Sequence, residues 1–140
     1  MVSDKQLGTI LVADDNPDIR KFAKIFLETA GWSVLTAVDG EEALQFYTAH
    51  QSAIVLLLTD VTMPNINGHE LADRVLGIDS HLPVLFMSGD QKNGYRGLEC
   101  VPKPFHREEL VDKVSQTLRG SAQPATRQCS LFQPSNLEGN

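Results

Sequence analysis

The sequence predicts an α/β domain built on one parallel sheet with helices on both faces. Three observations support this fold class. Short, continuously apolar runs alternate with segments in which apolar residues recur at helical spacing. The chain has 140 residues, of which 41% are hydrophobic and 21% charged, so one packed core can form. The longest apolar run, residues 53–58, has the length of a buried strand and is far too short to span a membrane.

The first strand and helix are predicted from residues 10 to 31. Residues 10–13 are continuously apolar, as expected for a strand covered on both faces, and the run stops at Asp14. Pro17 fits the first turn of a helix, and Gly31 is expected to close that helix. The residues expected to recur on its apolar face are Ile19, Phe22, Ala23, Phe26 and Ala30.

The middle of the chain repeats the alternation. Residues 33–37 predict a second strand, and helical spacing returns from 41 to about 49. Residues 54–59 are the most buried-looking strand, which ends at Asp60. A loop over residues 63–68 then leads into the third helix.

The last elements are shorter. Residues 83–87 predict a fourth strand, and residues around 99–101 a short fifth strand. The segment between them is brief and contains Gly94 and Gly97, which disfavour a regular helix. The final helix is expected from about 108 to 118.

The domain organisation follows from a change in composition after Gly120. Residues 1–120 are expected to form the folded domain. Residues 121–140 are polar, lack periodicity and are expected to be a disordered tail that is too short for an output domain.

Charge and composition exclude several function classes. The formal net charge is −6 and the basic residues are scattered along the sequence, so direct binding to nucleic acid is not expected. The four histidines have no metal-ligand spacing and are expected at the surface, and Cys100 and Cys129 have no predicted role. The first residues do not resemble a signal peptide, and no membrane association is expected, so a cytoplasmic location is predicted.

The functional residues are expected where the predicted strands end. Ligands of such sheets bind outside the carboxyl ends of the strands. These ends carry Asp14 and Asp15, then Asp60, Ser88 and Lys103. Crowded carboxylates repel one another and need a cation. Mg²⁺ suits this set, because it prefers oxygen ligands and often a phosphoryl oxygen.

This constellation predicts phosphoryl transfer. Mg²⁺ and a lysine beside a carboxylate neutralise the charge that develops in that reaction. Asp60 is the expected nucleophile, which would form an aspartyl phosphate. Ser88 and Lys103 would each hold a phosphoryl oxygen, and the backbone carbonyl of Thr62 could add a metal ligand. Each residue alone also fits a bland interpretation as a helix cap, a turn or a surface residue, and their coincidence at four strand ends favours the site.

At this point the chain resembles the receiver domain of two-component response regulators, over about residues 8–118. The motifs are specific in combination. They are residues 10–20 (ILVADDNPDIR), 59–64 (TDVTMP) with 68–71 (GHEL), 87–89 (MSG) and 101–105 (VPKPF).

The resemblance implies a flavodoxin-like, doubly wound five-stranded parallel sheet with strand order 2-1-3-4-5 and a shortened fourth helix. It implies that Asp60 accepts a phosphoryl group from a histidine kinase or phosphotransfer protein in a Mg²⁺-dependent reaction. Asp14, Asp15, Asp60 and Thr62 would hold the Mg²⁺, with Asp15 the more direct of the first two. Lys103 would precede a cis proline. The protein would be a conformational switch with an unknown downstream target, not a metabolic enzyme, and a phosphorylation-dependent homodimer is open.

Two departures from the family pattern concern signal output. Family members usually carry Tyr or Phe three residues before the lysine, where this chain has Cys100. The segment from Ser88 to Lys103 is also shorter than usual. In addition, Thr62 and Asp90 occupy positions that influence attack by water on the phosphoryl group in the family, although Asp90 equally fits a solvent-exposed loop carboxylate.

Other classes compete with this interpretation. The chain could be a free-standing regulator or the receiver of a hybrid kinase. A small Mg²⁺-dependent phosphatase would share the acidic cluster, but 140 residues leave no room for a cap or substrate pocket. A flavodoxin-like cofactor binder would need a phosphate-binding loop where Asp14 and Asp15 stand. The retained acidic residues argue against a pseudo-receiver.

Overall fold

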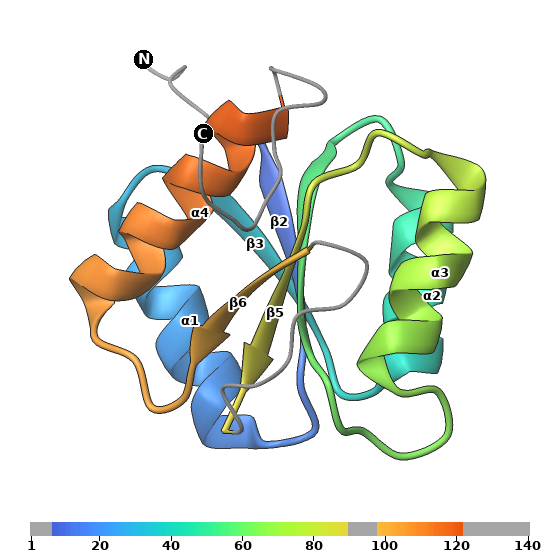
Figure 1. Cartoon of the computed structure of the whole chain (residues 1–140), viewed down its shortest axis with the longest axis horizontal. Coiled ribbons are helices and arrows are strands. Elements are labelled where there is room, and N and C mark those ends of the chain that lie inside the picture. Colours follow the sequence, from blue (N-terminus) through green and yellow to red (C-terminus); the bar gives the residue numbers. More distant parts are fainter. Residues whose placement is uncertain (1–6, 90–97, 122–140) are drawn as a thin grey trace, which may run out of the picture.

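Between residues 9 and 88, strands and helices alternate along the chain in the predicted order (Figure 1). The structure is a computed structural model that describes residues 7–89 and 98–121. Its elements are β2 (Thr9–Ala13), α1 (Pro17–Thr29), β3 (Ser33–Ala37), α2 (Gly40–Ala49), β4 (Ile54–Asp60), α3 (Gly68–Ile78), β5 (Val84–Ser88), β6 (Glu99–Pro102) and α4 (Arg107–Ser121). The predicted shortened fourth helix falls outside the described residues, whereas all the other strands and helices predicted from the sequence are present, with ends that differ by a few residues at most.

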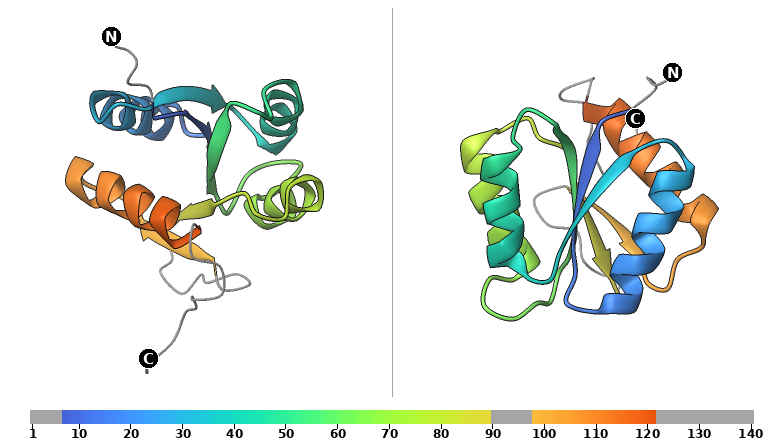
Figure 2. Two further views of the ribbon diagram at one scale, coloured as in Figure 1. Left: turned by 90° about the horizontal axis from the view of Figure 1, so that it is seen from above. Right: turned by 180° about the vertical axis from the view of Figure 1, so that it is seen from behind.

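The five strands form one parallel sheet in the order β3-β2-β4-β5-β6. Counted along the chain, this is the order 2-1-3-4-5, so the predicted doubly wound topology is confirmed. Helices α1 and α4 lie side by side on one face of the sheet, and α2 and α3 lie together on the other (Figure 2). The strand order reverses between β2 and β4, which is where such folds bind ligands.

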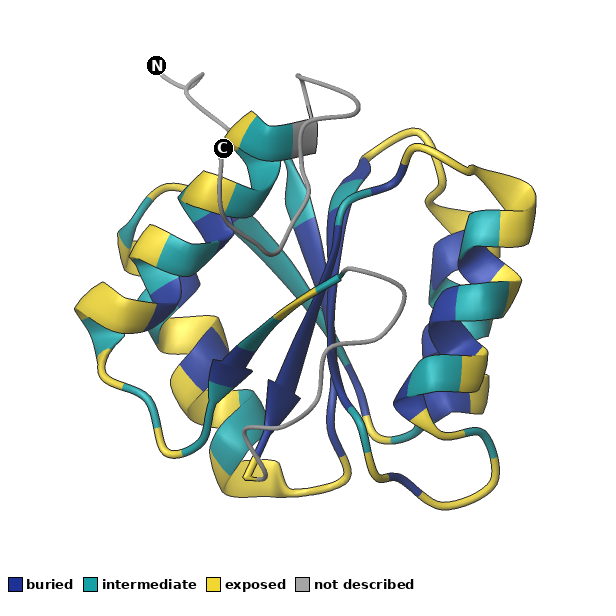
Figure 3. Cartoon of the chain, viewed as in Figure 1, coloured by how far each residue is buried: buried dark blue, intermediate teal, exposed yellow. Residues whose placement is uncertain are grey.

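The core lies on both faces of the central strands. Residues of β2, β4 and β5 are almost all buried (Figure 3). Their apolar side chains alternate between the two helical layers. Leu11 and Leu57 pack towards α2 and α3, whereas Ile10 and Leu58 pack towards α1 and α4. The continuous apolar runs of the sequence therefore reflect strands covered on both sides.

Each of the first three helices begins at a side-chain cap. The Asn16 side chain accepts hydrogen bonds from the backbone at Asp18 and Ile19. The side chains of Asp39 and Asn67 accept equivalent bonds at the starts of α2 and α3. These bonds satisfy backbone N–H groups that have no partner inside the helix.

Helix α1 corrects one expectation about its apolar face. Phe22 was expected on that face but is 47% exposed, and Leu27, which was not singled out, is fully buried. The buried residues of α1, Ala23 and Leu27, belong to the core that α1 and α4 form with the sheet. The Phe22 ring lies outside this core and stacks on Phe26 with centroids 6.2 Å apart.

Some predictions fall outside the described residues. These are the shortened fourth helix, Asp90, Cys129 and the character of residues 122–140, so the domain boundary also stays a prediction. No helix within residues 7–89 and 98–121 is both long and apolar enough to cross a membrane.

Candidate functional site

The predicted site residues meet at one edge of the sheet. Asp14 directly follows β2, Asp60 ends β4, Ser88 ends β5 and Lys103 directly follows β6. Because all strands are parallel, these ends lie together. The backbone N–H of Lys103 also donates to the carbonyl of Ser88 at 2.8 Å, which fixes the segment after β6 against β5.

Lys103 links the carboxylates of two strands. Its Nζ lies 3.0 Å from Asp14 Oδ2 and 3.2 Å from Asp60 Oδ1. Asp14 is fully buried, and the Lys103 side chain is 18% exposed. The peptide bond between Lys103 and Pro104 is cis, as the resemblance implied. Paired burial of this kind satisfies charges that would be costly alone.

Asp14 is held by its neighbours on the β2–α1 connection. Its Oδ1 accepts a hydrogen bond of 2.9 Å from the backbone N–H of Asn16. Its backbone carbonyl accepts a bond of 2.8 Å from the Arg20 guanidinium. The carboxylate is therefore fixed from both sides, with Oδ2 directed to Lys103.

The loop after β4 returns to its own starting point. The backbone of Thr62 donates a hydrogen bond to the Asp60 carboxylate. Gly68, which opens α3, donates to the carbonyl of Val61 at 2.8 Å. A Cβ at Gly68 would lie 2.1 Å from the carbonyl oxygen of Asp60, so only glycine fits this close approach. The motif that carries Gly68 thus sets the position of the loop beside the site.

The pKa values of the two central groups are perturbed. Burial, and then the charge of Asp14, raise the pKa of the Asp60 carboxyl, while Lys103 and the Thr62 amide act in the opposite direction. For Lys103, burial acts to lower the pKa, but its hydrogen bond to Asp14 and the charges of both carboxylates outweigh burial, so its pKa is raised. Lys103 is therefore a cation at neutral pH, and negative charge at Asp60 is only partly compensated.

The donor set fits a divalent cation. Asp14, Asp15 and Asp60 each offer a carboxylate oxygen, and these atoms lie within 4.8 Å of one another. Asp15 is exposed, whereas the other two are buried. Lys103 pairs with Asp14 and Asp60 of this group, so one cation stands against three carboxylates and negative charge is in excess. Such an oxygen cluster with partial solvent access matches the preference of Mg²⁺ for carboxylates and water.

The side of the site behind Ser88 has an unusual composition. Ser88 is buried, and two residues earlier on β5 Phe86 pairs in register with Cys100 of β6. Cys100 is partly buried in the core that lies towards α2 and α3, and its Sγ contacts the carbonyl of Val101 at 3.8 Å. The ring of His69 on α3 meets Phe86 edge-on at 5.2 Å. His69 is therefore partly buried, contrary to the expected surface position, while the other three histidines are exposed.

The sequence identified most of this arrangement. The structure brings together Asp14, Asp15, Asp60 and Lys103, places Ser88 at the adjoining strand end and directs the Thr62 amide to Asp60. The sequence did not indicate three further features: Asn16 as an anchor of Asp14, the contact of Arg20 with Asp14, and the steric requirement for glycine at position 68. The Asn-Pro pair at a helix start could have indicated the first of these. The other two depend on packing between separate segments.

Comparison with known proteins agrees with this geometry. Residues 10–115 match the family model of the response regulator receiver domain. The chain belongs to the receiver-domain family of two-component response regulators.

Among its relatives is the response regulator receiver protein CpdR of Brucella abortus. The two are 34% identical over 116 residues, which cover 78% of this chain and 95% of CpdR. Longer regulators also match, but the chain spans only about half of the length of each. The CpxR homolog of Haemophilus influenzae is 33% identical over 126 residues, which cover 85% of this chain and 54% of that protein.

Solved receiver structures share the fold. The receiver domain of the hybrid histidine kinase CckA is 37% identical, with a TM-score of 0.71 over 79% of this chain and 99% of that one. The response regulator TrrA of Thermotoga maritima, in complex with Mg²⁺ and BeF, is 30% identical, with a TM-score of 0.71 over 79% of this chain and 99% of TrrA.

Proposed function

We propose that this chain is a phosphoacceptor switch, in which Asp60 takes a phosphoryl group from the phosphohistidine of a histidine kinase or a phosphotransfer protein. One observation carries the proposal: Lys103 lies 3.2 Å from Asp60 within a cluster of three carboxylates that has room for a divalent cation. The titles of two neighbours support it, since one is the receiver of a hybrid histidine kinase and the other is a complex with Mg²⁺ and BeF.

The proposed reaction begins with attack by a carboxylate oxygen of Asp60 on the phosphorus atom. The new P–O bond forms while the P–N bond breaks, and the electron pair of that bond stays on the imidazole nitrogen. Bound Mg²⁺ would neutralise charge on the transferring oxygens and would be held by Asp14, Asp15, Asp60 and the carbonyl of Thr62. A cytoplasmic location stays part of this proposal.

Ser88 and Lys103 are proposed to hold the phosphoryl group afterwards. Lys103 Nζ already contacts Asp60 Oδ1, so it can form an ion pair with a phosphoryl oxygen on Asp60. The hydroxyl of Ser88 would donate a hydrogen bond from the next strand end. Both contacts favour one of two arrangements of the loops after β4 and β5, which is how the switch would act. In this proposal, each protein molecule is phosphorylated once per signalling event and does not hydrolyse phosphate esters at a steady rate.

The intact mass of the protein tests the acceptor. Wild type, Asp60→Asn and Asp112→Asn are incubated with acetyl phosphate and Mg²⁺, and Asp112 is an exposed carboxylate on α4 that lies outside the carboxylate cluster. We expect one added phosphoryl group in the wild type and in Asp112→Asn, and none in Asp60→Asn. Phosphorylation of Asp60→Asn would contradict the assignment, and steady hydrolysis of a phosphate ester would favour a phosphatase.

If the wild type gains no mass, a phosphorylated histidine phosphotransfer protein is used as the donor in the same three reactions. Transfer from this donor alone would mean that Asp60 accepts the phosphoryl group only from a protein donor and not from a small phosphodonor. Absence of transfer from both donors would overturn the proposed function and leave a docking role for the fold.

A further inference from the structure

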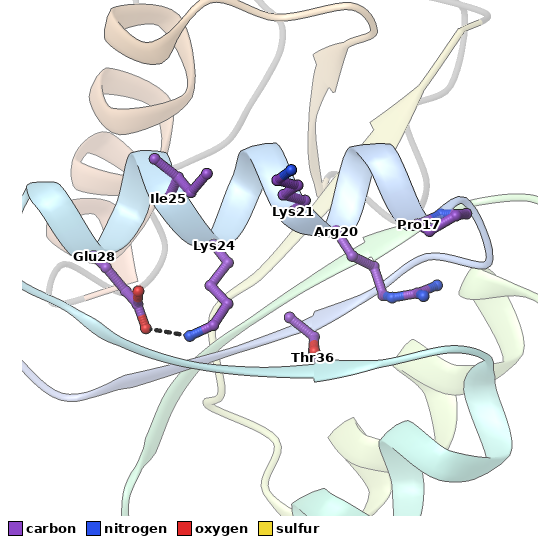
Figure 4. A pocket seen from close by; sticks show the side chains of 7 residues that line it. All are labelled: Pro17, Arg20, Lys21, Lys24, Ile25, Glu28 and Thr36. Atoms are coloured by element: carbon purple, nitrogen blue, oxygen red, sulfur yellow. Dashed lines mark hydrogen bonds and ion pairs between the residues drawn. The ribbon is translucent and has the colours of Figure 1, made fainter.

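A groove outside the phosphorylation site runs between helix α1 and the edge strand β3. Its volume is about 390 Å³. The lining residues are Pro17, Arg20, Lys21, Lys24, Ile25, Glu28 and Thr36. Figure 4 shows the side chain of Lys24 extending from α1 towards β3, with Thr36 pointing from β3 back towards the helix. None of these side chains is a carboxylate of the cluster, and Arg20 alone contacts it, through its bond to the backbone carbonyl of Asp14.

The groove is cationic in an acidic protein. Three of its side chains are cations and one is a carboxylate, whereas the whole chain has a net charge of −6. Lys24 and Glu28 form an ion pair of 2.5 Å, but both side chains are more than 40% exposed. Exposed pairs of this kind contribute little, so Lys24 can exchange Glu28 for another carboxylate. Positive charge is gathered here because residues 20, 21 and 24 lie on adjoining faces of α1.

Through Thr36, the groove adjoins an open edge of the sheet. β3 pairs with β2 alone among the described strands. The N–H of Ser33 donates to Gly8, and the carbonyl of Ala37 accepts from Asp14, so these two residues face β2. Alternation along a parallel strand then directs the backbone groups of Val34 and Thr36 away from β2. An extended peptide can pair with such groups and lengthen the sheet.

The charge of the groove decides between occupants. A second copy of this chain, paired edge to edge through β3, would bring the same three cations against this groove. The segment 122–140 carries one acidic and one basic side chain, Glu138 and Arg127, and so offers no excess negative charge. We propose that the groove binds an extended acidic segment of a partner protein, added as a strand along β3, with its carboxylates against Arg20, Lys21 and Lys24.

Titration with a defined peptide tests this proposal. The probe is a capped peptide of alternating Glu and Val with the length of β3, added to the ¹⁵N-labelled chain without Mg²⁺ or phosphodonor. We expect saturable shifts of the Val34 and Thr36 amides and of amides on α1 around Lys24. The same peptide with Lys in place of Glu should not bind. No saturable shift up to millimolar peptide, or shifts confined to other elements, would overturn the proposal.

Two further arms separate charge from strand pairing. The double variant with Lys21→Glu and Lys24→Glu should bind the acidic peptide about tenfold or more weakly, while the matched reversal Lys113→Glu on α4 should leave binding unchanged. The single variant Lys24→Gln replaces the double variant if the latter fails to fold. A peptide N-methylated at every residue keeps its charge but cannot donate hydrogen bonds to β3, so its binding should also fall about tenfold. Equal binding by the methylated peptide would exclude strand addition.

Discussion

At the scale of single residues, Lys103 stabilises two carboxylates from separate strands. It contacts Asp14, which is fully buried, and Asp60. Replacing Lys103 with Met keeps the length of the side chain and removes the charge, so both carboxylates lose a partner. We expect the metal-free variant to lose about 1–3 kcal/mol in the free energy of unfolding, less than for a fully buried pair because Lys103 is partly exposed. Urea denaturation in EDTA, followed by the fluorescence of buried Trp32, measures this loss.

The matched control for this variant is Lys113→Met. Lys113 also forms an ion pair, with Glu99 at 2.7 Å, but at the surface. Its loss should cost at most about 1 kcal/mol. Equal losses for the two variants would mean that Lys103 contributes no more than a surface pair.

Ionisation of Tyr47 is expected to lower the stability of the fold at alkaline pH. Burial, and then the charge of Asp79, raise the pKa of its phenol above 10.0, with an opposing hydrogen bond from Gln51. Between the unfolded and the folded pKa, the Tyr47 phenol therefore keeps its proton in the folded protein and loses it in the unfolded chain. The stabilisation is complete below about pH 10 and is lost as the pH rises through the folded pKa, by about 1.4 kcal/mol for each pH unit between the two pKa values. Tyr47→Phe should lack this loss, and parallel unfolding profiles of variant and wild type from about pH 8 to pH 11 would contradict the assignment.

At the scale of elements, the start of α3 depends on Gly68. A methyl group there meets the backbone of Asp60 and Val61 and not a flexible side chain, so the helix must move. We expect Gly68→Ala to cost about 1–3 kcal/mol of stability and to shift the loop that carries Thr62. Gly77→Ala in the same helix is the control, since a Cβ there meets nothing within 4 Å, and it should stabilise by up to about 1 kcal/mol. Urea denaturation of both variants checks the opposite signs.

The elements were predictable because their signals are local. Apolar runs identify β2, β4 and β5, and Pro17 and Gly31 bound the first helix. The same is true of the carboxylates, since the end of a strand can be read from its sequence. The exposure of Phe22 and the partial burial of His69 could not be read in this way, because they depend on packing between elements. No element covers Phe22 on α1 enough to bury it, whereas Phe86 of β5 packs against His69 of α3.

Charge grouping shows the same limit at the surface. The basic residues look scattered in the sequence, yet Arg20, Lys21 and Lys24 line one groove because the next strand, β3, packs against α1 and adds Thr36 to the lining. Helical spacing could have placed them on adjoining faces of α1. Only the position of β3 beside α1 makes them a site.

At the scale of the whole molecule, the fold gathers negative charge that a cation should relieve. The carboxylates of Asp14, Asp15 and Asp60 come from two strand ends and lie within 4.8 Å, in a chain whose net charge is −6. Folding creates this cluster, so a cation that binds it stabilises the folded state alone. At a Mg²⁺ concentration one hundred times the dissociation constant, the expected gain is about 2.7 kcal/mol. Asp15 is exposed, so Asp15→Asn should preserve the fold while removing a ligand.

Thermal denaturation with and without Mg²⁺ measures this linkage, with NaCl at matched ionic strength to account for screening of the net charge. The melting temperature of the wild type and of Asp112→Asn should rise with Mg²⁺, and that of Asp15→Asn should rise much less. Without metal, Asp15→Asn should be at least as stable as the wild type, since one of three mutually repelling carboxylates is gone. If Mg²⁺ raises the melting temperature of Asp15→Asn as much as that of the wild type, the cation binds elsewhere. If NaCl gives the same rise as Mg²⁺, the stabilisation is only screening of the net charge. Only a cation held by the cluster makes the effect depend on Asp15 and not on Asp112.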